Sequence, residues 1–459
     1  MPKVAKGETL VIGLGVSGWA ICRHLARQGV AFMVADTREV PPRLDEFRAA
    51  HPGVALHCGA LTMLDMSEAA EIVVSPGVDP HTPGLAEMWG CRRDSGEPLV
   101  VGEMALFVRA ARAPIAAITG SNAKSTVTTL LGEMAETAGR RVAVGGNLGT
   151  PALDLLVDVP EAELYVLELS SFQLETTPCL GAETAAFLNL SEDHLDRHGD
   201  LAGYRAAKLG IFRGARHAVV NAEDAMTWPL EPLPAMDRFT TLPPQAGEWG
   251  IARQADRDWL MHGDTALMAT DELGLAGRHN QANALAALAM GRQLGFPLDA
   301  MCEVLRRFKG LVHRSELIAE RDGIRWINDS KGTNVGATLA AIAGLGPTLS
   351  GRVVLLAGGL GKGADFTPLA EPLARYGREA ILFGADAAQL AAALQDSVAV
   401  TRVADLGAAM QRARAIAEPG DCVLLSPACA SLDQFPNYMA RGEAFRQWVQ
   451  RHVEECGHG

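Results

Sequence analysis

Short apolar runs alternate with amphipathic stretches and with turns rich in glycine or proline along most of the chain. Near the N-terminus, residues 10–12 form an apolar run that enters a glycine turn, an amphipathic stretch and a second apolar run at residues 31–35. This order predicts strand, turn, helix and strand, the right-handed parallel unit of α/β sheets. The stretch EIVVSPGVDP predicts another strand that stops at a Ser75-Pro76-Gly77 turn, and residues 91–99 resemble a tether or a sheet edge.

The middle of the chain repeats this alternation. The apolar run IAAIT leads through GSNAK into a helical pattern that ends at Gly139, and two further runs, ELYVLELSSFQLE and TAAFLNLSEDHLDRHGD, are followed by polar residues. Residues 224–276 change character, since proline-rich turns and short alternating pieces predict a small antiparallel patch. The stretch GRHNQANALAALAMGRQLG then predicts a helix.

The last third of the chain contains four more apolar runs that end in small or polar residues. They are GIRWINDSKGTN, RVVLLAGGLGKGADF, EAILFG and DCVLLSPACASLDQF. Strands that alternate with helices predict a parallel α/β sheet, and ligands bind such sheets at the carboxyl ends of the strands. Nearly every polar cluster of this sequence follows a strand, so we expect the binding sites at those edges.

Bulk properties narrow the class of protein. At about 100–200 residues per domain, the 459 residues predict two to four domains. A net charge of -13 argues against non-specific binding to nucleic acid or to an anionic membrane surface. The eight cysteines include no C-x-x-C pair, and the N-terminus has neither a signal peptide pattern nor a long apolar run. We therefore expect a cytoplasmic protein with reduced thiols.

The stretch ITGSNAKSTVTT is close to the phosphate-binding pattern G-x-x-x-x-G-K-[ST]. Its small residues could turn their backbone N–H groups toward phosphate, Lys124 could bind the β and γ phosphates, and Ser125 or Thr126 could bind Mg²⁺. Ala123 stands where the pattern has glycine, so we expect a negative φ there, because a positive φ would strain alanine. The alternative is a capped helix with an incidental lysine.

A second glycine-rich turn lies in the first segment. Gly13-x-Gly15-x-x-Gly18 follows a strand, and Asp36 lies some way further on, as in dinucleotide-binding units. The pattern indicates an anionic, nucleotide-like group at the helix N-terminus. A tight turn that merely packs helix on strand remains the alternative.

Three ionisable side chains of the middle segment are candidates with ordinary alternatives. Glu168 ends a strand and could bind Mg²⁺ opposite the loop, or it could be a solvated strand end. His194 lies in a run of ionisable groups and could bind a metal or substrate, or it could belong to a surface loop. Lys208 has apolar neighbours on a predicted helix and by itself indicates a surface lysine with a buried stem.

Cations and hydroxyls recur after the strands of the third segment. They are the pair at 313–314, the stretch 329–334, Gly361-Lys362-Gly363 and the stretch 426–431. Brought to one sheet edge, they would suit a small carboxylate ligand. Glycine-rich loops with incidental lysines are the alternative.

Together these motifs resemble the Mur ligase family of peptidoglycan synthesis over essentially the whole chain. The stretches that carry the resemblance are GSNAKST, GGNLGTPA, LELSSFQLE, SEDHLDRH, GRHNQANALAA, the His-Arg pair at 313–314, DSKGTN and LLSPACASLDQF. The last two resemble the branch of the family that adds D-glutamate, and no D-N-P-R stretch of the diaminopimelate-adding type is present. The loop at 120–125 is similar to the family's short form G-x-N-G-K-[ST], with Ala123 replacing its last glycine.

The resemblance implies an α/β fold of three domains. Residues 1–102 would form a Rossmann-like domain that binds the UDP substrate, and residues 103–310 a central P-loop ATPase-type parallel sheet with a small antiparallel patch. Residues 311–459 would form a Rossmann-like domain that binds the amino acid and nucleotide. We expect the domains to close over the substrates and the protein to be a monomer.

The resemblance also implies a reaction. ATP would convert the carboxylate of UDP-N-acetylmuramoyl-L-alanine into an acyl phosphate, and the amine of D-glutamate would then displace phosphate. Two Mg²⁺ sites are implied, with Ser125 and Glu168 at the first and His194 and Lys208 at the second. A lysine ammonium cannot bind a cation, so the resemblance implies that CO₂ carbamylates Lys208 and makes it an anionic ligand.

The remaining roles are carried over from the family's motifs. The residues implied in ATP binding are Gly120, Ser121, Asn122, Ala123, Lys124, Ser125, Thr126, Asn280, Asn283, Arg314 and Asp329. Those implied in binding the UDP substrate are Ser17, Thr37, Arg38, Ser75, Gly77, Asn147 and His194. Those implied in binding D-glutamate are Lys331, Thr333, Lys362, Ser431 and Tyr438. Lys124, His194 and Lys208 are the implied catalytic residues.

Three positions depart from the family pattern. Besides Ala123, Leu360 stands in GGLGKG where an acid is expected, and Tyr438 stands where phenylalanine is usual. Other classes of protein fit parts of the sequence. They are a related Mur or folylpolyglutamate-type ligase, an NAD-dependent dehydrogenase that uses the glycine turn, and a non-catalytic nucleotide-binding regulator.

Overall fold

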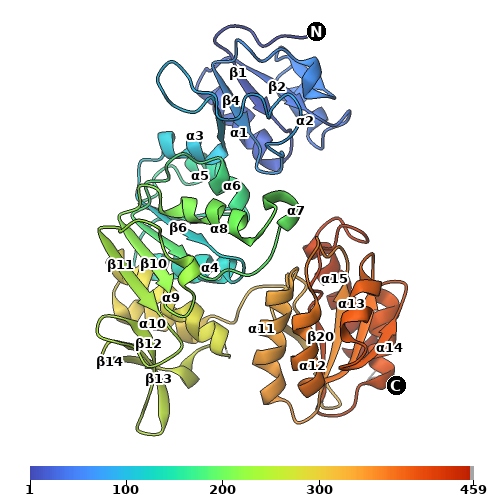
Figure 1. Cartoon of the computed structure of the whole chain (residues 1–459). Helices are drawn as coiled ribbons and strands as arrows, with labels where there is room; N and C mark the ends of the chain where they lie inside the picture. The colour runs from blue at the N-terminus through green and yellow to red at the C-terminus, as the bar shows by residue number, and fades with distance from the viewer. Residues whose placement is uncertain (276, 455–459) are drawn as a thin grey trace.

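The computed structural model describes residues 1–275 and 277–454, and it contains three separate sheets in chain order. Figure 1 shows these sheets with helices packed on both of their faces. Two sheets are mostly parallel and one is wholly parallel, so the predicted α/β class is confirmed. Within the described residues, no helix is long and apolar enough to span a bilayer.

The first sheet has five parallel strands in the order β3-β2-β1-β4-β5. These strands are β1 (Thr9–Ile12), β2 (Phe32–Asp36), β3 (Leu56–Cys58), β4 (Glu71–Val74) and β5 (Val100–Gly102). The accompanying helices are α1 (Val16–Arg27), α2 (Leu44–Ala50) and the 3₁₀ turn η1 (Leu61–Met63). The strands predicted at 10–12 and 31–35 are thus confirmed to within one residue, and the stretch 91–99 contains only an isolated Arg92–Pro98 bridge.

Two glycines fix the turn between β1 and α1. Gly13 has a φ of +93°, which glycine adopts without strain. A Cβ on Gly18 would lie 1.7 Å from the carbonyl oxygen of Gly13, so no larger residue fits there. The pattern in the sequence therefore reflects a close approach of helix to turn.

The central sheet has nine strands in the order β14-β13-β12-β11-β10-β9-β6-β8-β7. Its parallel part comprises β6 (Ile115–Thr119), β7 (Val142–Gly146), β8 (Leu164–Glu168), β9 (Thr184–Phe187), β10 (His217–Asn221) and β11 (Ala235–Phe239). The strands β12 (Trp249–Gln254), β13 (Arg257–His262) and β14 (Thr265–Ala269) pair antiparallel and confirm the predicted patch, although β11 within 224–276 is parallel. Residue 276 lies outside the described residues.

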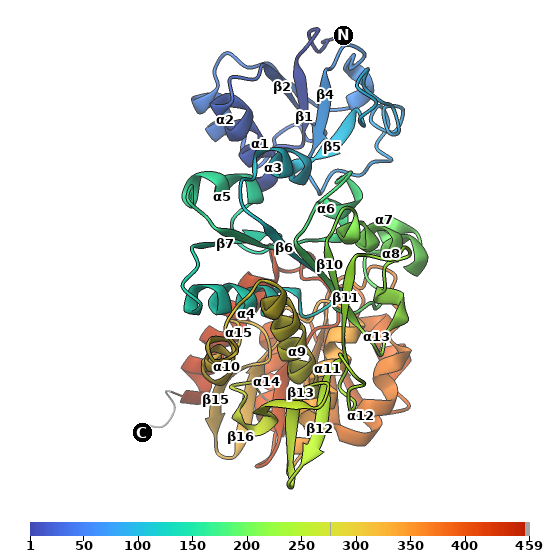
Figure 2. The same cartoon turned by 90° about the vertical axis from the view of Figure 1, so that its left-hand side faces the viewer.

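Helices cover both faces of the central sheet, as Figure 2 shows. On one face α4 (Lys124–Thr137), α9 (Arg278–Gln293) and α10 (Leu298–Arg307) bury an apolar cluster with the strands. The other face carries α3 (Glu103–Ala110), α5 (Ala152–Asp158), α6 (Ser171–Glu175) and α8 (Leu201–Leu209), and the short helix α7 (Leu195–His198) lies beside α8. A second apolar cluster runs from α1 through α3 into β6 and β8, so the first and central sheets share a continuous core.

The third sheet has six strands in the order β15-β16-β20-β17-β18-β19. They are β15 (Glu316–Arg321), β16 (Ile324–Asn328), β17 (Val353–Gly358), β18 (Gly377–Phe383), β19 (Ala399–Arg402) and β20 (Cys422–Leu425), and all but β15 pair in parallel. Its helices are α11 (Val335–Leu345), α12 (Ala370–Tyr376), α13 (Ala387–Leu394), α14 (Leu406–Ile416) and α15 (Tyr438–Val449). Because β20 lies between β16 and β17, the loops after all three strands meet at one edge.

Candidate active site

The loop between β6 and α4 has a backbone that differs from the sequence prediction. Ala123 has φ 67° and ψ −7°, in the left-handed region, so the expected negative φ is wrong. This conformation lets the chain reverse at the helix N-terminus and turn successive backbone N–H groups to one side, as phosphate-binding loops require. The geometry of a loop glycine is retained, and alanine bears a strain of about 1–2 kcal/mol.

We expect the substitution Ala123→Gly to leave the thermal unfolding midpoint unchanged or to raise it. Relief of about 1–2 kcal/mol of strain exceeds or matches the roughly 0.4–1 kcal/mol lost because glycine makes the unfolded chain more flexible. The matched control is Ala135→Gly, at a buried position inside the same helix. This change should lower the unfolding midpoint, because glycine is a poor helix former. Equal destabilisation by both changes, measured by calorimetry, would show that the left-handed conformation is not strained.

Lys124 begins α4 and curls over its own loop. Its Nζ donates hydrogen bonds to the carbonyl oxygens of Gly120, at 2.9 Å, and Ser121, at 3.0 Å. Burial lowers the pKa of Lys124 to about 8, with Arg314 and Lys331 lowering it further and Glu168 opposing them. An anion that enters the loop would compete for this ammonium group and stabilise its charge.

The Ser125 hydroxyl and the Glu168 carboxylate form a hydrogen-bonded pair next to Lys124. Ser125 Oγ donates a hydrogen bond of 2.5 Å to Glu168 Oε2, and Asn147 Nδ2 donates one of 2.6 Å to Glu168 Oε1. Burial raises the pKa of Glu168, but Lys124 and Lys331 with these two hydrogen bonds outweigh it, so the pKa lies below its usual value. Glu168 is therefore a buried, charged carboxylate and not a solvated strand end.

Side chains from the third segment reach the same hydroxyl. Arg314 Nη2 donates to Ser125 Oγ at 2.8 Å, and Lys331 Nζ lies 3.3 Å from that oxygen and 3.1 Å from the Tyr438 hydroxyl. Burial lowers the pKa of Lys331 to about 8. Lys124, Arg314 and Lys331 thus bring three cations to the one carboxylate of Glu168, which leaves an excess of positive charge suited to phosphates.

Asp329, in the DSK stretch, anchors the loops that lie next to these cations. Asp329 Oδ2 accepts a hydrogen bond from Ser426 Oγ at 2.7 Å, and Oδ1 accepts one from the backbone N–H of Ser315 at 3.1 Å. Burial raises the pKa of Asp329 to about 6, although these hydrogen bonds and Arg314 act against the rise. Asp329 thereby fixes the turn that carries Arg314.

His194 follows β9 and starts the short helix α7 with a φ of 54°. Its ring packs against Phe172, with centroids 4.8 Å apart, and its Nε2 lies 3.6 Å from Asp193 Oδ2. Burial lowers the pKa of His194 to about 4 in spite of Asp193, so the imidazole is neutral at pH 7. A neutral imidazole can ligate a metal or hydrogen-bond to a substrate.

Asp193 joins the central and third sheets, and we did not single it out as a site residue from the sequence. Its Oδ1 accepts from Lys362 Nζ at 3.1 Å, and its Oδ2 accepts from Asn334 Nδ2 at 3.3 Å. Asn334 also lies 3.2 Å from Asn122 Oδ1 in the phosphate loop. The available signals were the position of Asp193 beside His194 and that of Asn334 within DSKGTN.

Lys208 is not the surface lysine that its local sequence indicates. It is only 1% exposed, and its Nζ donates to the carbonyl oxygen of Gly120 at 2.8 Å and lies 4.6 Å above the Tyr204 ring. Burial, together with Lys124, lowers the pKa of Lys208 well below its usual value. The interpretation failed because the apolar neighbours of Lys208 pack into the core and take the lysine with them.

The other candidates for nucleotide and amino-acid binding lie around this centre. Asn283 Nδ2 donates to Asn280 Oδ1 at 3.2 Å in the first turns of α9, and Asn280 lines a small apolar hollow with Thr126 and Leu275. Ser431 is buried in the loop after β20, and Thr333 is half-buried in the loop after β16. These positions border the loop at residues 120–126 or the edge of the third sheet.

Two of the candidates for binding the UDP substrate, Asn147 and His194, follow strands of the central sheet, and the other five lie at the carboxyl edge of the first sheet. Asp36 Oδ2 accepts from the N–H of Leu14 at 2.7 Å, and the carboxylate also holds the Arg38 guanidinium, with Nε at 2.8 Å. Ser75 Oγ donates to the Gly13 carbonyl oxygen at 2.8 Å, so its hydroxyl braces the glycine turn. The remaining candidates are more accessible: Ser17 is half-buried, and Thr37 and Gly77 are exposed.

The pKa values of Lys124 and Lys331 predict a pH dependence of nucleotide binding. Both amines are protonated below about pH 8 and lose their charge above it. A bound phosphate raises both pKa values, so we expect proton uptake on ADP binding near pH 8 and an affinity that falls about tenfold between pH 7 and pH 9. Calorimetry in two buffers of different ionisation enthalpy measures this uptake.

The variant Lys331→Arg provides the control for that measurement. Its guanidinium does not titrate in this range, so proton uptake should decrease while binding persists. A dissociation constant for ADP that stays within twofold from pH 7 to pH 9 would contradict the expectation.

Three successive parts of the chain match parts of one family. Residues 7–91 match the Mur ligase MurD-like N-terminal domain, residues 118–291 the Mur ligase middle domain, and residues 313–429 the Mur ligase glutamate ligase domain. The chain belongs to the Mur ligase family.

Full-length relatives specify a branch of that family. The chain is 70% identical to the UDP-N-acetylmuramoylalanine–D-glutamate ligase of Chromohalobacter salexigens, with 98% of each chain covered. It is 52% identical to the enzyme of that name from Pseudomonas aeruginosa, with 96% of this chain and 97% of the relative covered. This family membership leaves the dehydrogenase alternative without support.

Solved structures agree on the fold. The MurF ligase of Thermotoga maritima in complex with ADP is similar with a TM-score of 0.61 at 15% identity, covering 99% of this chain and 98% of that chain. The E. coli FolC structure with DHPP and ADP is similar with a TM-score of 0.58 at 20% identity, covering 76% of this chain and 92% of that chain. At such identities the likeness concerns the fold alone.

Proposed function

We propose that this chain is an ATP-dependent ligase that joins D-glutamate to UDP-N-acetylmuramoyl-L-alanine through an acyl phosphate and releases ADP and phosphate. One observation carries the proposal. Cations from the central and third sheets converge on Ser125 and Glu168, at the phosphate loop of a chain that is 70% identical to a D-glutamate ligase over 98% of its length. The step belongs to peptidoglycan precursor synthesis, which takes place in the cytoplasm.

The cations act mainly by position and charge. Phosphoryl transfer develops negative charge on the equatorial oxygens of the moving group, and fixed cations stabilise that charge without rearranging. Lys124 binds the β and γ phosphates, and Arg314 and Lys331 approach from the third domain. Their arrival across the interface makes domain closure part of catalysis, because it assembles the site and excludes water.

The residues present fit Mg²⁺. Ser125 Oγ and Glu168 Oε2, which belongs to a charged carboxylate, lie 2.5 Å apart, and both are oxygen atoms of the kind that ligate Mg²⁺. In residues 1–275 and 277–454 no group of three or more His, Cys, Asp or Glu is arranged to hold a metal. Phosphate oxygens and water would complete the coordination of a bound Mg²⁺, as is usual for this ion. Bound Mg²⁺ would neutralise phosphate charge, and a second ion would use His194 and a carbamylated Lys208.

The environment of Lys208 favours carbamylation. Its depressed pKa makes a neutral amine available, and the amine nitrogen can attack the carbon of CO₂, lose one proton and become an anionic carbamate. Lys124, close enough to shift the pKa of Lys208, would stabilise the negative charge. ¹³C NMR of protein in ¹³C-bicarbonate should show a carbamate carbon, and its absence from active protein would dismiss the modification.

The substrates are assigned to three proposed domains. Residues 1–102 bind the UDP part through Ser17, Thr37, Arg38, Ser75 and Gly77, and residues 103–310 bind ATP and present Asn147 and His194 to the muramoyl-alanine part. Residues 311–459 bind D-glutamate through Lys331, Thr333, Lys362, Ser431 and Tyr438. The positive charge of the two lysines suits the two carboxylates of this acceptor.

The test is phosphate release from ATP with Mg²⁺ and UDP-N-acetylmuramoyl-L-alanine in the presence of one acceptor at a time. D-glutamate, L-glutamate, L-alanine and meso-diaminopimelate form the panel. We expect release with D-glutamate alone. Release with a different acceptor would retain the ligase and overturn the substrate, whereas ADP binding without release would support a regulator.

A further inference from the structure

The turn that joins β18 to α13 contains an aspartate, Asp386, whose side chain bonds to a neighbouring loop and not to the backbone N–H groups of its own helix. Asp386 occupies the N-cap position of α13, where an aspartate ordinarily accepts from the N–H groups of its own helix, but its side chain makes no such bond. Its Oδ2 instead accepts a hydrogen bond of 2.6 Å from the N–H of Gly361, and its Oδ1 accepts one of 2.9 Å from Gln389 Nε2. The carboxylate thus holds the backbone N–H of Gly361, the residue directly before Lys362.

The backbone of the same turn is pressed against the same loop. The N–H of Asp386 donates to the carbonyl oxygen of Gly359 at 3.0 Å. A Cβ on Gly384, whose φ is +80°, would lie 2.8 Å from the Gly359 nitrogen, so the turn and the GGLGKG loop touch backbone to backbone. These contacts flank Lys362, whose φ of 55° is unfavourable for a residue with a side chain and needs restraint.

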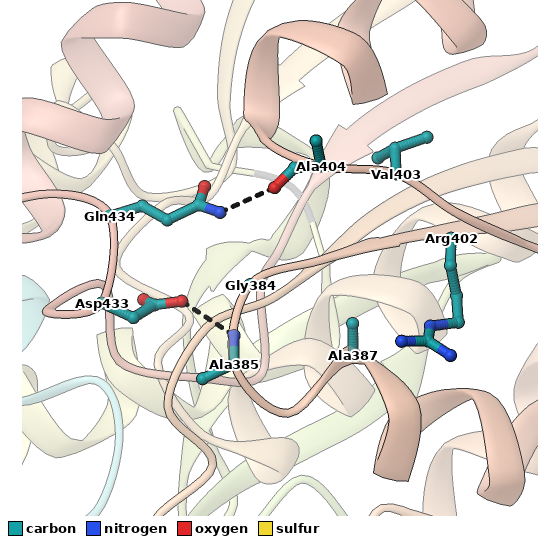
Figure 3. Close-up of a pocket in the computed structure, with 8 residues that line it drawn as sticks. All are labelled: Gly384, Ala385, Ala387, Arg402, Val403, Ala404, Asp433 and Gln434. Carbon is teal, nitrogen blue, oxygen red and sulfur yellow. Dashed lines mark hydrogen bonds between the residues drawn. The ribbon is translucent and has the colours of Figure 1, made fainter.

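The turn also holds the loop after β20. Asp433 Oδ2 accepts from the N–H of Ala385 at 3.0 Å, as Figure 3 shows. The two loops pair with each other through the N–H of Leu360 and the carbonyl oxygen of Ala430 at 2.9 Å. Residues 384–386 therefore fasten both the loop that carries Lys362 and the loop that carries Ser431.

Hydrogen bonds do most of this work, because packing supports the turn on one side only. An open cavity of about 480 Å³ borders Gly384 and Ala385 on the other side, and its wall continues through Arg402, Ala404 and Gln434. Gln434 Nε2 crosses this wall to the carbonyl oxygen of Ala404 at 2.9 Å. Without its polar ties the turn could move into the cavity and release the loops.

We propose that Asp386 is a positioning residue for the acceptor amino acid, acting through Gly361 on the placement of Lys362. The inference rests on the proposed function, since it needs Lys362 to bind an acceptor carboxylate. The hydrogen bonds that the structure describes for the Asp386 carboxylate go to Gly361 and Gln389, and neither of these is a proposed nucleotide or acceptor residue. Its loss should therefore weaken acceptor binding and leave nucleotide binding unchanged.

The experiment compares Asp386→Ala and Asp386→Asn with Asp405→Ala. Asp405 is the matched control, because it starts the next helix at the same sheet edge but caps that helix normally, accepting from the N–H of Ala408 at 2.8 Å. Steady-state kinetics should show the KM for D-glutamate raised about tenfold in Asp386→Ala, the effect of losing one charge-assisted hydrogen bond. The asparagine variant keeps a neutral acceptor and should lie between alanine and wild type.

Two further readouts separate positioning from folding. The KM for ATP and the dissociation constant of ADP should stay within twofold in all variants, and Asp405→Ala should keep the wild-type KM for D-glutamate even if its unfolding midpoint falls. Amide hydrogen exchange at residues 359–363 should accelerate in Asp386→Ala alone.

The outcomes distinguish the two proposals. A wild-type protein without D-glutamate-dependent phosphate release overturns the proposed function. A wild type that does use D-glutamate, with an unchanged KM or unchanged exchange in Asp386→Ala, overturns the positioning role alone. An equal rise of the KM values for ATP, UDP-N-acetylmuramoyl-L-alanine and D-glutamate in Asp386→Ala would also overturn the positioning role, because it would indicate a general structural effect.

Discussion

The substitution Lys124→Ala is expected to lower the rate of ADP formation by about a thousandfold. Loss of one fixed donor to a developing oxyanion typically costs about 10²–10³ in rate, and Lys124 would face the most highly charged part of the transferring phosphoryl group. The lysine already curls over the loop, with its Nζ 2.9 Å from the Gly120 carbonyl oxygen. The measurement is kcat for ADP formation with saturating substrates.

Folding should survive the loss of Lys124. Burial has lowered its pKa, which means that the folded protein holds the charged form less favourably than water does, so removal of the charge should not lower the unfolding midpoint at pH 7. The control is Lys309→Ala at an exposed lysine, which should keep wild-type kcat and stability. A Lys124→Ala enzyme within tenfold of wild-type kcat would remove this residue from the mechanism.

The substitution Lys208→Arg is expected to reduce ligation at least as severely, by about a thousandfold, while ADP still binds. Arginine keeps a positive charge but cannot form a carbamate, and its planar group is larger than the ammonium that now fits between the Gly120 carbonyl and the Tyr204 ring. If the carbamate is the functional form, the variant replaces an anionic ligand with a cation. Initial rates of phosphate release, with and without added bicarbonate, measure the effect.

Bicarbonate provides the discriminating control for Lys208. Wild-type protein depleted of CO₂ should lose activity and recover it when bicarbonate is added, whereas Lys208→Arg should respond to neither treatment. The exposed Lys6→Arg serves as the control for lysine replacement. A Lys208→Arg variant with near wild-type activity would show that an anionic side chain is not required at this position.

Burial disfavours the charged form of both lysines at the phosphate loop. Lys124 and Lys208 both donate to the Gly120 carbonyl oxygen, and each pKa is depressed by burial. Lys124 keeps its charge at pH 7, and a fixed, partly desolvated cation interacts more strongly with an incoming phosphate than a solvated one, because the surrounding dielectric is lower. The same burial leaves Lys208 as an amine that can react with CO₂.

The fold followed closely from local patterns. Predicted strands at 10–12 and 31–35 became Thr9–Ile12 and Phe32–Asp36, and IAAIT became β6 with the phosphate loop directly after it. Such features depend on the periodicity of apolar residues and on turn residues, which act over a few positions. The motifs also sufficed to identify the family, which the full-length relatives confirmed. The domain boundaries and the roles of the site residues remain predictions.

Local rules failed where packing decided the outcome. Negative φ was expected at Ala123 from the preference of alanine, yet the loop imposes φ 67° because the chain must reverse there. Lys208 was interpreted as a surface lysine from its neighbours, yet the helix that carries it buries the side chain to 1% exposure. In both cases the surrounding structure outweighs the preference of one residue.

The sequence by itself determined the elements, the α/β class, the phosphate loop and the family, because these depend on short-range patterns and on motifs. Only the tertiary structure decided which side chains meet. Arg314 and Lys331 reach Ser125 across 189 and 206 positions of sequence, and Asp386 reaches Gly361 from the turn after the following strand. Such contacts depend on how whole sheets and their loops pack against one another, which no local pattern encodes.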